Sequence, residues 1–306
     1  MPPATDVLKA TVLPDRSVLS ITGPDTRKFL QGMITNDIRR LAPERQRVLY
    51  TGFLTAQGKL LHDAFLIDDG ERILIDIATD FVAGFVKRLT AFRLREAVEF
   101  GEATPGLGVV VAWGAAAAAK LGLDDTEGTM DAGPARLAFV DPRLAALGAR
   151  LVYPADNAAI EADLGRLGFH LVTSSDYAAH RVALGIADTT EIGGEILYPL
   201  EANFEALHGV DFRKGCYIGQ ELTARMRLKG ELRKQILPVT GATALPAIGT
   251  MITADATALG PLIATSGSEG LALLRMDRLA EVPQDVVRAG DVRLAVRRPD
   301  WLSPGE

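Results

Sequence analysis

The segment from Asp211 to Arg227, DFRKGCYIGQELTARMR, holds the densest group of chemically capable side chains in the sequence. Cys216, the only cysteine of the chain, lies two residues after Lys214 and beside Gly215. Gly219 precedes residues suited to open a helix, and the positive field of a helix N-terminus and of basic neighbours favours a thiolate. Thiolate is the form that binds metals or attacks electrophiles. The pattern predicts a reactive thiol with Lys214 as its basic neighbour; the alternative is a small buried hydrophobic side chain.

One thiolate cannot complete a metal site, because zinc and iron–sulfur sites need several protein ligands. The sequence contains no HExxH, CxxC, Walker loop or GxGxxG motif, and its histidines show no metal-ligand spacing: His62, His170, His180 and His208. Cys216 is therefore expected to supply one ligand of a cluster whose other ligands come from a partner protein. A single cysteine also excludes an intrachain disulfide and fits a reducing compartment.

A basic cluster follows the cysteine. Arg225, Arg227 and Lys229 alternate, and Lys229-Gly230-Glu231 has the composition of a hairpin turn, so we interpret Arg225 to Lys234 as a basic strand. Side chains on one strand face suit an anion, such as a carboxylate tail, a phosphate or RNA. A solvated edge strand that its charges protect from pairing is the equal alternative.

Two carboxylates lie in otherwise apolar or rigid segments. Asp63 belongs to the run LLHDAF, and Glu201 follows Pro199 in YPLEAN. A buried carboxylate matches paired N–H donors on a heterocyclic ring. Taken singly, each of the two is interpreted as a surface or capping residue.

The elements that position these residues are expected to belong to the α+β class. The first third predicts a strand over 17–22, a helix after the turn at 23–25 and antiparallel strands between 47 and 78. The helical spacing of apolar residues from Phe81 to Leu89 predicts a second helix, with Thr79 as its N-cap. The middle, over 98–173, mixes strands and helices without a βαβ rhythm. After Gln235, short β-rich runs alternate with Gly, Pro and Asp turns, which predicts a small β-barrel.

The domains expected are an α+β region over residues 1–235, made of two subdomains split near 98–173, and a C-terminal β-barrel over 236–306. With 306 residues and 48% hydrophobic side chains, the chain is large enough for two or three parts with their own cores.

Charge and hydropathy exclude some functions. The net charge of −6 argues against a general nucleic-acid binder, although a local basic patch is compatible with it. Met1 to Asp6 lacks the basic head and apolar stretch of a signal peptide. The longest apolar run, Leu107 to Ala119, is shorter than the roughly 20 residues that a membrane span needs. We therefore expect a cytoplasmic protein that does not enter the membrane.

Residues Lys214 to Glu221, KGCYIGQE, resemble the signature of the YgfZ family, which are folate-binding proteins related to the glycine-cleavage aminomethyltransferase (T-protein). The string is long and specific. Further stretches agree with the family in the same order: 22–25, 29–32, 35–37, 53–54, 58–59, 199–203 and 271–275. The resemblance covers nearly the full chain and is weakest in the middle third.

The resemblance implies a T-protein-like body of two α+β portions around a central folate channel, with a C-terminal β-barrel packed on it. It implies a role in assembly or repair of iron–sulfur clusters, chiefly maturation of [4Fe–4S] enzymes, including those that modify tRNA. The implied cofactor is tetrahydrofolate or a one-carbon derivative, with a transient cluster shared with a partner. The implied partners are iron–sulfur cluster carrier proteins and [4Fe–4S] client enzymes, with an indirect link to tRNA.

The functional cysteine of the family motif carries over to Cys216, with Lys214 beside it. Similarity to T-protein makes Glu201 and Asp63 the candidates on the pterin side of the folate. The expected cofactor-binding set also includes Asn203, Gln220, Arg225 and Arg227.

Two departures from T-protein favour an assembly factor without independent turnover. A pair of aspartates in T-protein corresponds to His62-Asp63 here, and a folate-contacting asparagine is replaced within Ile75 to Ala78. Two alternatives stay open. One is a tetrahydrofolate-dependent aminomethyltransferase or other one-carbon transferase. The other is a module that binds tRNA or a partner through the basic strand from Arg225 to Lys234.

Overall fold

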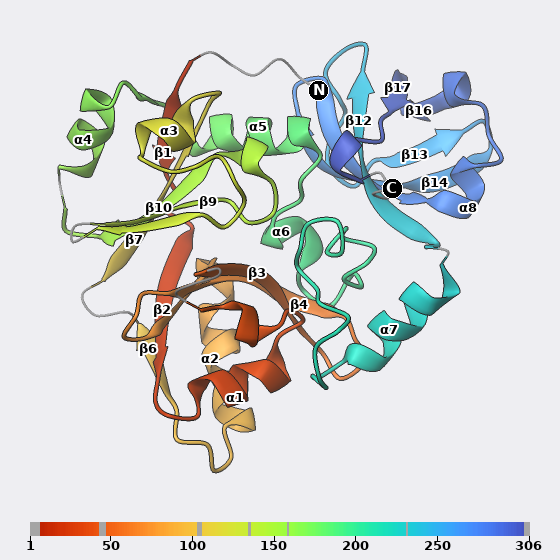
Figure 1. Ribbon diagram of the computed structural model, residues 1–306. Helices are drawn as coiled ribbons and strands as arrows, with labels where there is room; N and C mark the ends of the chain where they lie inside the picture. Colours follow the sequence, from red (N-terminus) through yellow and green to blue (C-terminus); the bar gives the residue numbers. More distant parts are fainter. Residues whose placement is uncertain are drawn as a thin grey trace.

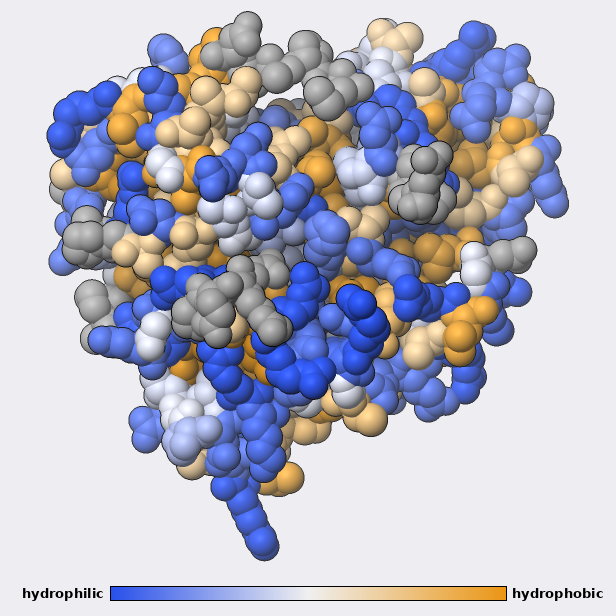
Figure 2. All heavy atoms as spheres, viewed as in Figure 1, coloured by the Kyte–Doolittle hydropathy of each residue, from blue (hydrophilic) through white to orange (hydrophobic). Residues whose placement is uncertain are grey.

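The computed structural model describes residues 7–42, 47–102, 106–133, 136–157, 159–230 and 232–302. Its strands form two open sheets and one closed barrel, and these three parts surround a common centre (Figure 1). No helix in the described ranges is long and apolar enough to cross a membrane. On the face seen in Figure 2, hydrophilic side chains predominate near the centre.

The first sheet has the strand order β3-β4-β5-β2-β6. Its strands, all antiparallel to their neighbours, are β2 (Arg16–Thr22), β3 (Val48–Leu54), β4 (Leu60–Asp68), β5 (Ile73–Ala78) and β6 (Glu99–Glu102). Helices α1 (Thr26–Met33) and α2 (Val82–Phe92) cover one face, and they share a core with alternate strand residues. The structure confirms the strands and both helices predicted for the first third of the chain.

The second sheet has the order β11-β1-β7-β10-β9-β8. Its strands are β1 (Lys9–Val12), β7 (Leu107–Trp113), β8 (Met130–Gly133), β9 (Arg136–Val140), β10 (Ala149–Pro154) and β11 (His170–Leu171). Helices α3 (Ala117–Lys120) and α4 (Ile160–Arg166) pack on one face. Helix α5 (Ser174–Leu184) lies between this sheet and the barrel, with Tyr177 against Trp113.

The C-terminal strands close into a barrel in the order β12-β15-β14-β13-β16-β17, which confirms the predicted β-barrel. They are β12 (Lys234–Gly241), β13 (Met251–Ala254), β14 (Thr257–Ser266), β15 (Glu269–Arg275), β16 (Val287–Ala289) and β17 (Val292–Val296), with the short helix α8 (Met276–Leu279). One buried cluster contains side chains from both sheets and from the barrel, so the three parts share a core.

The predicted basic strand is wrong, because Gln220–Lys229 forms a helix, α7. Alternating arginines suggested a period of two, but most residues of QELTARMRLK are strong helix formers. Gly219 and Gly230 bound the helix with φ of 81° and 70°, a left-handed conformation that glycine adopts without strain. Glu231, assigned to the predicted turn, lies outside the described residues.

A buried chain of alternating charges connects the two sheets. The Asp76 carboxylate of β5 accepts from Arg16 of β2 at 2.6 Å and from Arg150 of β10 at 2.8 Å. Arg150 also reaches Asp141 at 3.3 Å, and Asp141 pairs with Arg143 at 2.8 Å. All five side chains are almost completely inaccessible to solvent. Such charges are tolerated only when each one is paired.

Replacing Asp76→Asn is expected to lower the free energy of unfolding by about 3–5 kcal/mol, because two buried guanidinium groups lose their shared carboxylate. The matched control is Asp163→Asn, which removes a solvent-exposed pair with Arg166 and should cost less than about 1 kcal/mol. Urea denaturation measures both. Equal, small losses in the two variants would contradict the role of the buried charges.

Candidate functional site

The segment from Asp211 to Gly219 connects to α7 and carries an exposed Cys216 thiol. Backbone hydrogen bonds hold both ends of this segment, called here the thiol loop, against α1. The Asp211 N–H donates to the Thr35 carbonyl at 3.1 Å, and the Ile218 N–H donates to the Gly32 carbonyl at 3.0 Å. The loop therefore presents the sulfur to solvent from a fixed base.

Lys214 strengthens that base. Its ammonium group donates to the carbonyls of Gln31 at 2.9 Å and Ile34 at 2.5 Å, at the C-terminal end of α1. It also lies 4.6 Å from the ring centre of Tyr217. A cation is stabilised at a helix C-terminus, but burial lowers the pKa of Lys214 to about 8. The side chain acts on α1, so Lys214 is a positioning residue for the thiol loop.

Close packing at the start of α7 explains why residue 219, within the Lys214 to Glu221 motif, is a glycine. A Cβ atom on Gly219 would lie 2.4 Å from the Thr55 carbonyl oxygen and 3.0 Å from Gly58. Gln220 ties the same turn, because its Oε1 accepts from the Tyr217 N–H at 3.2 Å. The backbone of the β3–β4 turn thus fixes where α7 begins.

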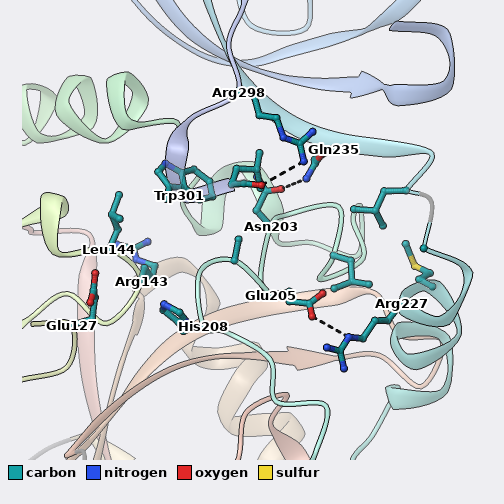
Figure 3. Close-up of a pocket in the computed structure, with 16 residues that line it drawn as sticks. Glu127, Arg143, Leu144, Asn203, Glu205, His208, Arg227, Gln235, Arg298 and Trp301 are labelled. Carbon is teal, nitrogen blue, oxygen red and sulfur yellow. Dashed lines mark hydrogen bonds and ion pairs between the residues drawn. The ribbon is translucent and has the colours of Figure 1, made fainter. Parts of the chain in front are cut away.

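A cavity of about 810 Å³ lies between α7, the 200–208 segment, the loops next to β8 and β9 of the second sheet, and the barrel with the residues that follow it (Figure 3). Its lining comes from widely separated parts of the chain: Glu127, Arg143, Leu144, Leu200, Asn203, Glu205, Ala206, His208, Met226, Arg227, Gly230, Leu232, Gln235, Arg298, Trp301 and Leu302. This volume is within the range of small-molecule and cofactor sites. Cys216 does not belong to the lining, so the thiol and the cavity are separate features connected by α7.

Two walls of the cavity are fixed by polar contacts. On the α7 side, Arg227 donates to Glu205 at 3.0 Å and lies 4.1 Å from the ring centre of Phe212. On the barrel side, the Gln235 amide donates to the Asn203 side chain at 2.9 Å (Figure 3). Asn203 in turn donates to the Ile236 carbonyl at 2.9 Å. Of the predicted cofactor-binding residues, Asn203 and Arg227 therefore line the cavity.

The segment that carries Asn203 is unusual in its backbone. Asn203 and His208 both have positive φ, 62° and 57°, and both line the cavity. Left-handed conformations of non-glycine residues cost energy and persist where the surrounding structure imposes them. Here Asn203 is held by its two side-chain hydrogen bonds to β12.

The other predicted cofactor-binding residues lie elsewhere. Asp63 accepts hydrogen bonds from the Tyr50 hydroxyl at 2.9 Å and from the Thr189 hydroxyl, inside the core. Glu201 is buried and accepts from the Tyr198 N–H at 3.0 Å. Gln220 lies at the start of α7, and Arg225 pairs with Glu221 at 2.6 Å on its exposed side. None of these four lines the cavity.

Arg143 is the cavity residue that sequence reasoning missed. Its side chain is buried, and its Nε and Nη2 atoms donate to Asp141 at 3.0 and 2.8 Å. Burial by itself lowers the pKa of Arg143, but the Asp141 carboxylate outweighs it and keeps the group charged. The remaining nitrogen, Nη1, has no hydrogen-bond partner in the described structure. The only sequence signal was a charged pair, Asp141 and Arg143, directly after an apolar strand.

His62 is buried against the rings of Phe81 and Phe85, with ring centres 5.0 and 5.8 Å away. Its Nδ1 atom has no partner in the described structure. Burial, assisted by the charge of Arg88, lowers the pKa of His62 to about 4. The imidazole is therefore neutral near pH 7.

The described residues contain no group of three or more His, Cys, Asp or Glu side chains that could hold a metal ion.

Comparison with known proteins identifies the family. A family model described as the CAF17 C-terminal beta-barrel domain matches residues 233–304. The iron-sulfur cluster assembly factor IBA57, mitochondrial, of Homo sapiens is 32% identical over 309 residues, which cover 94% of this chain and 84% of the human protein. The chain belongs to the IBA57 family of iron–sulfur cluster assembly factors. The Neurospora crassa IBA57 homolog is 36% identical over 240 residues, which cover 74% of this chain and 52% of that protein. The match thus spans about half the length of the Neurospora relative.

The solved structure of the glycine cleavage system aminomethyltransferase T from Bartonella henselae superposes with a TM-score of 0.78. The match covers 97% of this chain and 87% of that chain at 14% sequence identity. It confirms the predicted T-protein-like α+β fold. At this identity the likeness shows the fold alone, so it adds nothing to the transferase alternative.

The prediction of a cytoplasmic location is wrong. The IBA57 relatives from Homo sapiens, Neurospora crassa and Coccidioides immitis are named mitochondrial proteins, which contradicts that expectation. The prediction relied on the composition of Met1 to Asp6 and on the short apolar runs, and neither feature distinguishes the cytoplasm from the interior of mitochondria. Met1 to Asp6, on which it depended in part, lie outside the described residues.

The low pKa of His62 predicts a pH dependence of stability. The unfolded chain takes up the His62 proton near pH 6.5 and the folded protein only near pH 4, so stability is lost as pH falls through this window. The full loss is about 3 kcal/mol. His62→Phe, which keeps the aromatic packing, should remove this contribution. The measurement is the difference in unfolding free energy between the two proteins from pH 7 to pH 4, and a constant difference would contradict the assignment.

Replacing Lys214→Met should loosen the thiol loop, because two hydrogen bonds to the end of α1 are lost. Hydrogen exchange of the Ile218 amide, which donates to Gly32, should accelerate by about tenfold or more. Lys229→Met, at the exposed end of α7, is the matched control and should leave that amide unchanged. Unchanged exchange in both variants would show that Lys214 does not hold the loop.

Proposed function

We propose that this protein assists the assembly of iron–sulfur clusters and that Cys216 provides one thiolate ligand to a cluster completed by a partner. The observation that carries the proposal is the exposed thiol of a lone cysteine on a loop that is fixed to α1. Membership of the IBA57 family supports it, since the relatives are named iron–sulfur cluster assembly factors. The cluster is the cargo of this activity.

The arrangement of the loop suits ligation shared between two proteins. The sulfur is open to solvent, whereas the Lys214 side chain is turned onto the carbonyls of α1. A protein partner that carries a cluster can therefore approach the thiol without displacing structure. A ligating cysteine must lose its proton, which an iron-bearing partner displaces when the sulfur binds.

We further propose the finer assignment suggested by the YgfZ resemblance. In this view the partners are cluster carrier proteins and [4Fe–4S] client enzymes, among them enzymes that modify tRNA. The link to tRNA is then indirect. The net charge of −6 supports protein partners over direct RNA binding, and so do the ion pairs that engage Arg225 and Arg227.

The ligand proposed for the central cavity is tetrahydrofolate or a one-carbon derivative. A volume of about 810 Å³ is ample for such a molecule. Asn203, Arg227 and Gln235 offer polar groups on two walls, and Trp301 offers an aromatic face. When bound, the folate would bring a reduced pterin or a one-carbon unit to this cavity. The protein's own residues fix the cavity walls and keep the ligand apart from the thiol.

The test is anaerobic reconstitution of a cluster in the presence of a cluster carrier protein. Wild-type protein should form a shared cluster with the carrier, and Cys216→Ser should lose most of it, because a hydroxyl is a poor ligand for iron. Circular dichroism should show the same fold for both, since the side chain is exposed.

The matched control is Ser174→Ala, a hydroxyl removed from the start of α5, away from the thiol loop. It should reconstitute as the wild type does. A shared cluster formed equally well by Cys216→Ser would exclude Cys216 as a ligand.

A further inference from the structure

The buried charge chain between the sheets contains more cations than anions. Its order is Arg16, Asp76, Arg150, Asp141 and Arg143, so an arginine stands at each end. Each aspartate is shared between two arginines. One positive charge is therefore left over unless a further carboxylate meets one of the ends.

The two ends differ in this respect. At the first, Arg16 lies 3.8 Å from the carboxylate of Asp188. At the second, Arg143 has Asp141 as its only ion-pair partner in the described part of the chain. Its Nη1 atom is buried and makes no hydrogen bond there. A buried guanidinium nitrogen without a partner is costly, so this end of the chain lacks an acceptor.

Arg143 is also the end that borders the central cavity. In Figure 3 it lies beside Leu144 and His208, on the wall opposite Arg227. The two carboxylates among the described lining residues are both engaged elsewhere. Glu127 accepts from the Ala145 N–H at 3.1 Å, and Glu205 pairs with Arg227. Among the described residues, no carboxylate of the lining is left to serve as the acceptor that Arg143 lacks.

We infer that the central cavity binds its ligand through a carboxylate placed against Arg143. A guanidinium is suited to this role, because its planar set of donors matches the oxygens of a carboxylate. That the ligand is a folate rests on the proposed function, and a folate would place its glutamate end at Arg143. That the ligand carries a carboxylate rests only on the residues of the cavity.

This placement contrasts with the pterin-side roles expected for Asp63 and Glu201. The carboxylate oxygens of both residues accept hydrogen bonds from hydroxyl or backbone donors of the protein, and neither residue lines the cavity. The unsatisfied group at the cavity is a donor and a cation. Accordingly, the charged end of the ligand contributes most of the selectivity.

Calorimetric titration of the full-length wild-type protein with four probes tests the inference. The probes are tetrahydrofolate, 6-methyltetrahydropterin, p-aminobenzoylglutamate and the diamide of p-aminobenzoylglutamate. We expect p-aminobenzoylglutamate to bind. Its uncharged diamide should bind about tenfold more weakly or worse, because it loses one charge-assisted hydrogen bond. The pterin alone should bind more weakly than tetrahydrofolate by a similar factor.

A variant locates the carboxylate. Arg143→Lys keeps the charge beside Asp141 but loses the fork of donors, so p-aminobenzoylglutamate should bind about tenfold more weakly. Arg298→Lys, on the barrel wall, should not weaken binding to the same extent. If only Arg298→Lys weakens it, the carboxylate lies at the barrel and the inference is overturned. The four-probe comparison on wild-type protein stands even if Arg143→Lys does not fold.

The remaining outcomes separate this inference from the proposed function. Binding of p-aminobenzoylglutamate without tetrahydrofolate would support the carboxylate site and reject folate as the ligand. Equal binding of tetrahydrofolate and the pterin, with none of p-aminobenzoylglutamate, would overturn the carboxylate site and retain folate. If no probe binds, both are rejected, while the role of Cys216 is unaffected.

Discussion

The buried Asp76 carboxylate accepts hydrogen bonds from one arginine of each sheet, and the way in which the two sheets pack depends on it. Charges cannot stay in an interior unless their partners are held in place, so the chain from Arg16 to Arg143 constrains how the sheets meet. The shared apolar cluster supplies burial but little direction, because the hydrophobic effect is non-directional. The charge chain supplies the geometry. It also ends at the cavity, so the packing of the body and the polarity of the cavity have the same origin.

Helix α7 joins the two functional features. The thiol loop precedes its first turn, whereas Met226 and Arg227 near its C-terminal end line the cavity. Met226 lies six residues after Gln220, the first residue of α7, which is about 9 Å along the helix axis. The Cys216 thiol and the cavity are therefore separate features of the structure, and α7 connects them. Tight packing of Gly219 against Thr55 and Gly58 fixes one end, and the Arg227–Glu205 pair holds the other.

Much of the fold followed from the sequence, because its signals are local. The alternation in 17–22, the turns between the strands of 47–78 and the helical spacing of Phe81 to Leu89 all reflect which side chains face the core. The short β-rich runs and turns of the C-terminal region likewise predicted the barrel. The strand predicted from Arg225 to Lys229 was wrong because alternating charges do not distinguish an exposed strand from an exposed helix. The high helix propensity of these residues favours the helix that is observed.

The site was only partly predictable. The exposure of Cys216 agrees with its setting among glycines and basic residues. Lys214, predicted as the basic neighbour of the thiol, instead directs its ammonium group to carbonyls at the end of α1. Arg143 could not be foreseen, because its importance arises from Asp141, Arg150 and Asp76, which come together only in the folded structure. The partners of Asp63 could not be foreseen for the same reason, since Tyr50 and Thr189 come from distant segments.

The direct test of the central claim is a spectroscopic view of the atom bonded to iron. With Cys216→selenocysteine, X-ray absorption at the selenium edge of the protein reconstituted with a carrier protein reports whether selenium has iron as a neighbour. Ligation by residue 216 predicts an iron neighbour at bonding distance when the shared cluster is present and none when it is absent. A shared cluster whose formation leaves selenium with carbon as its only bonded neighbour would contradict the account.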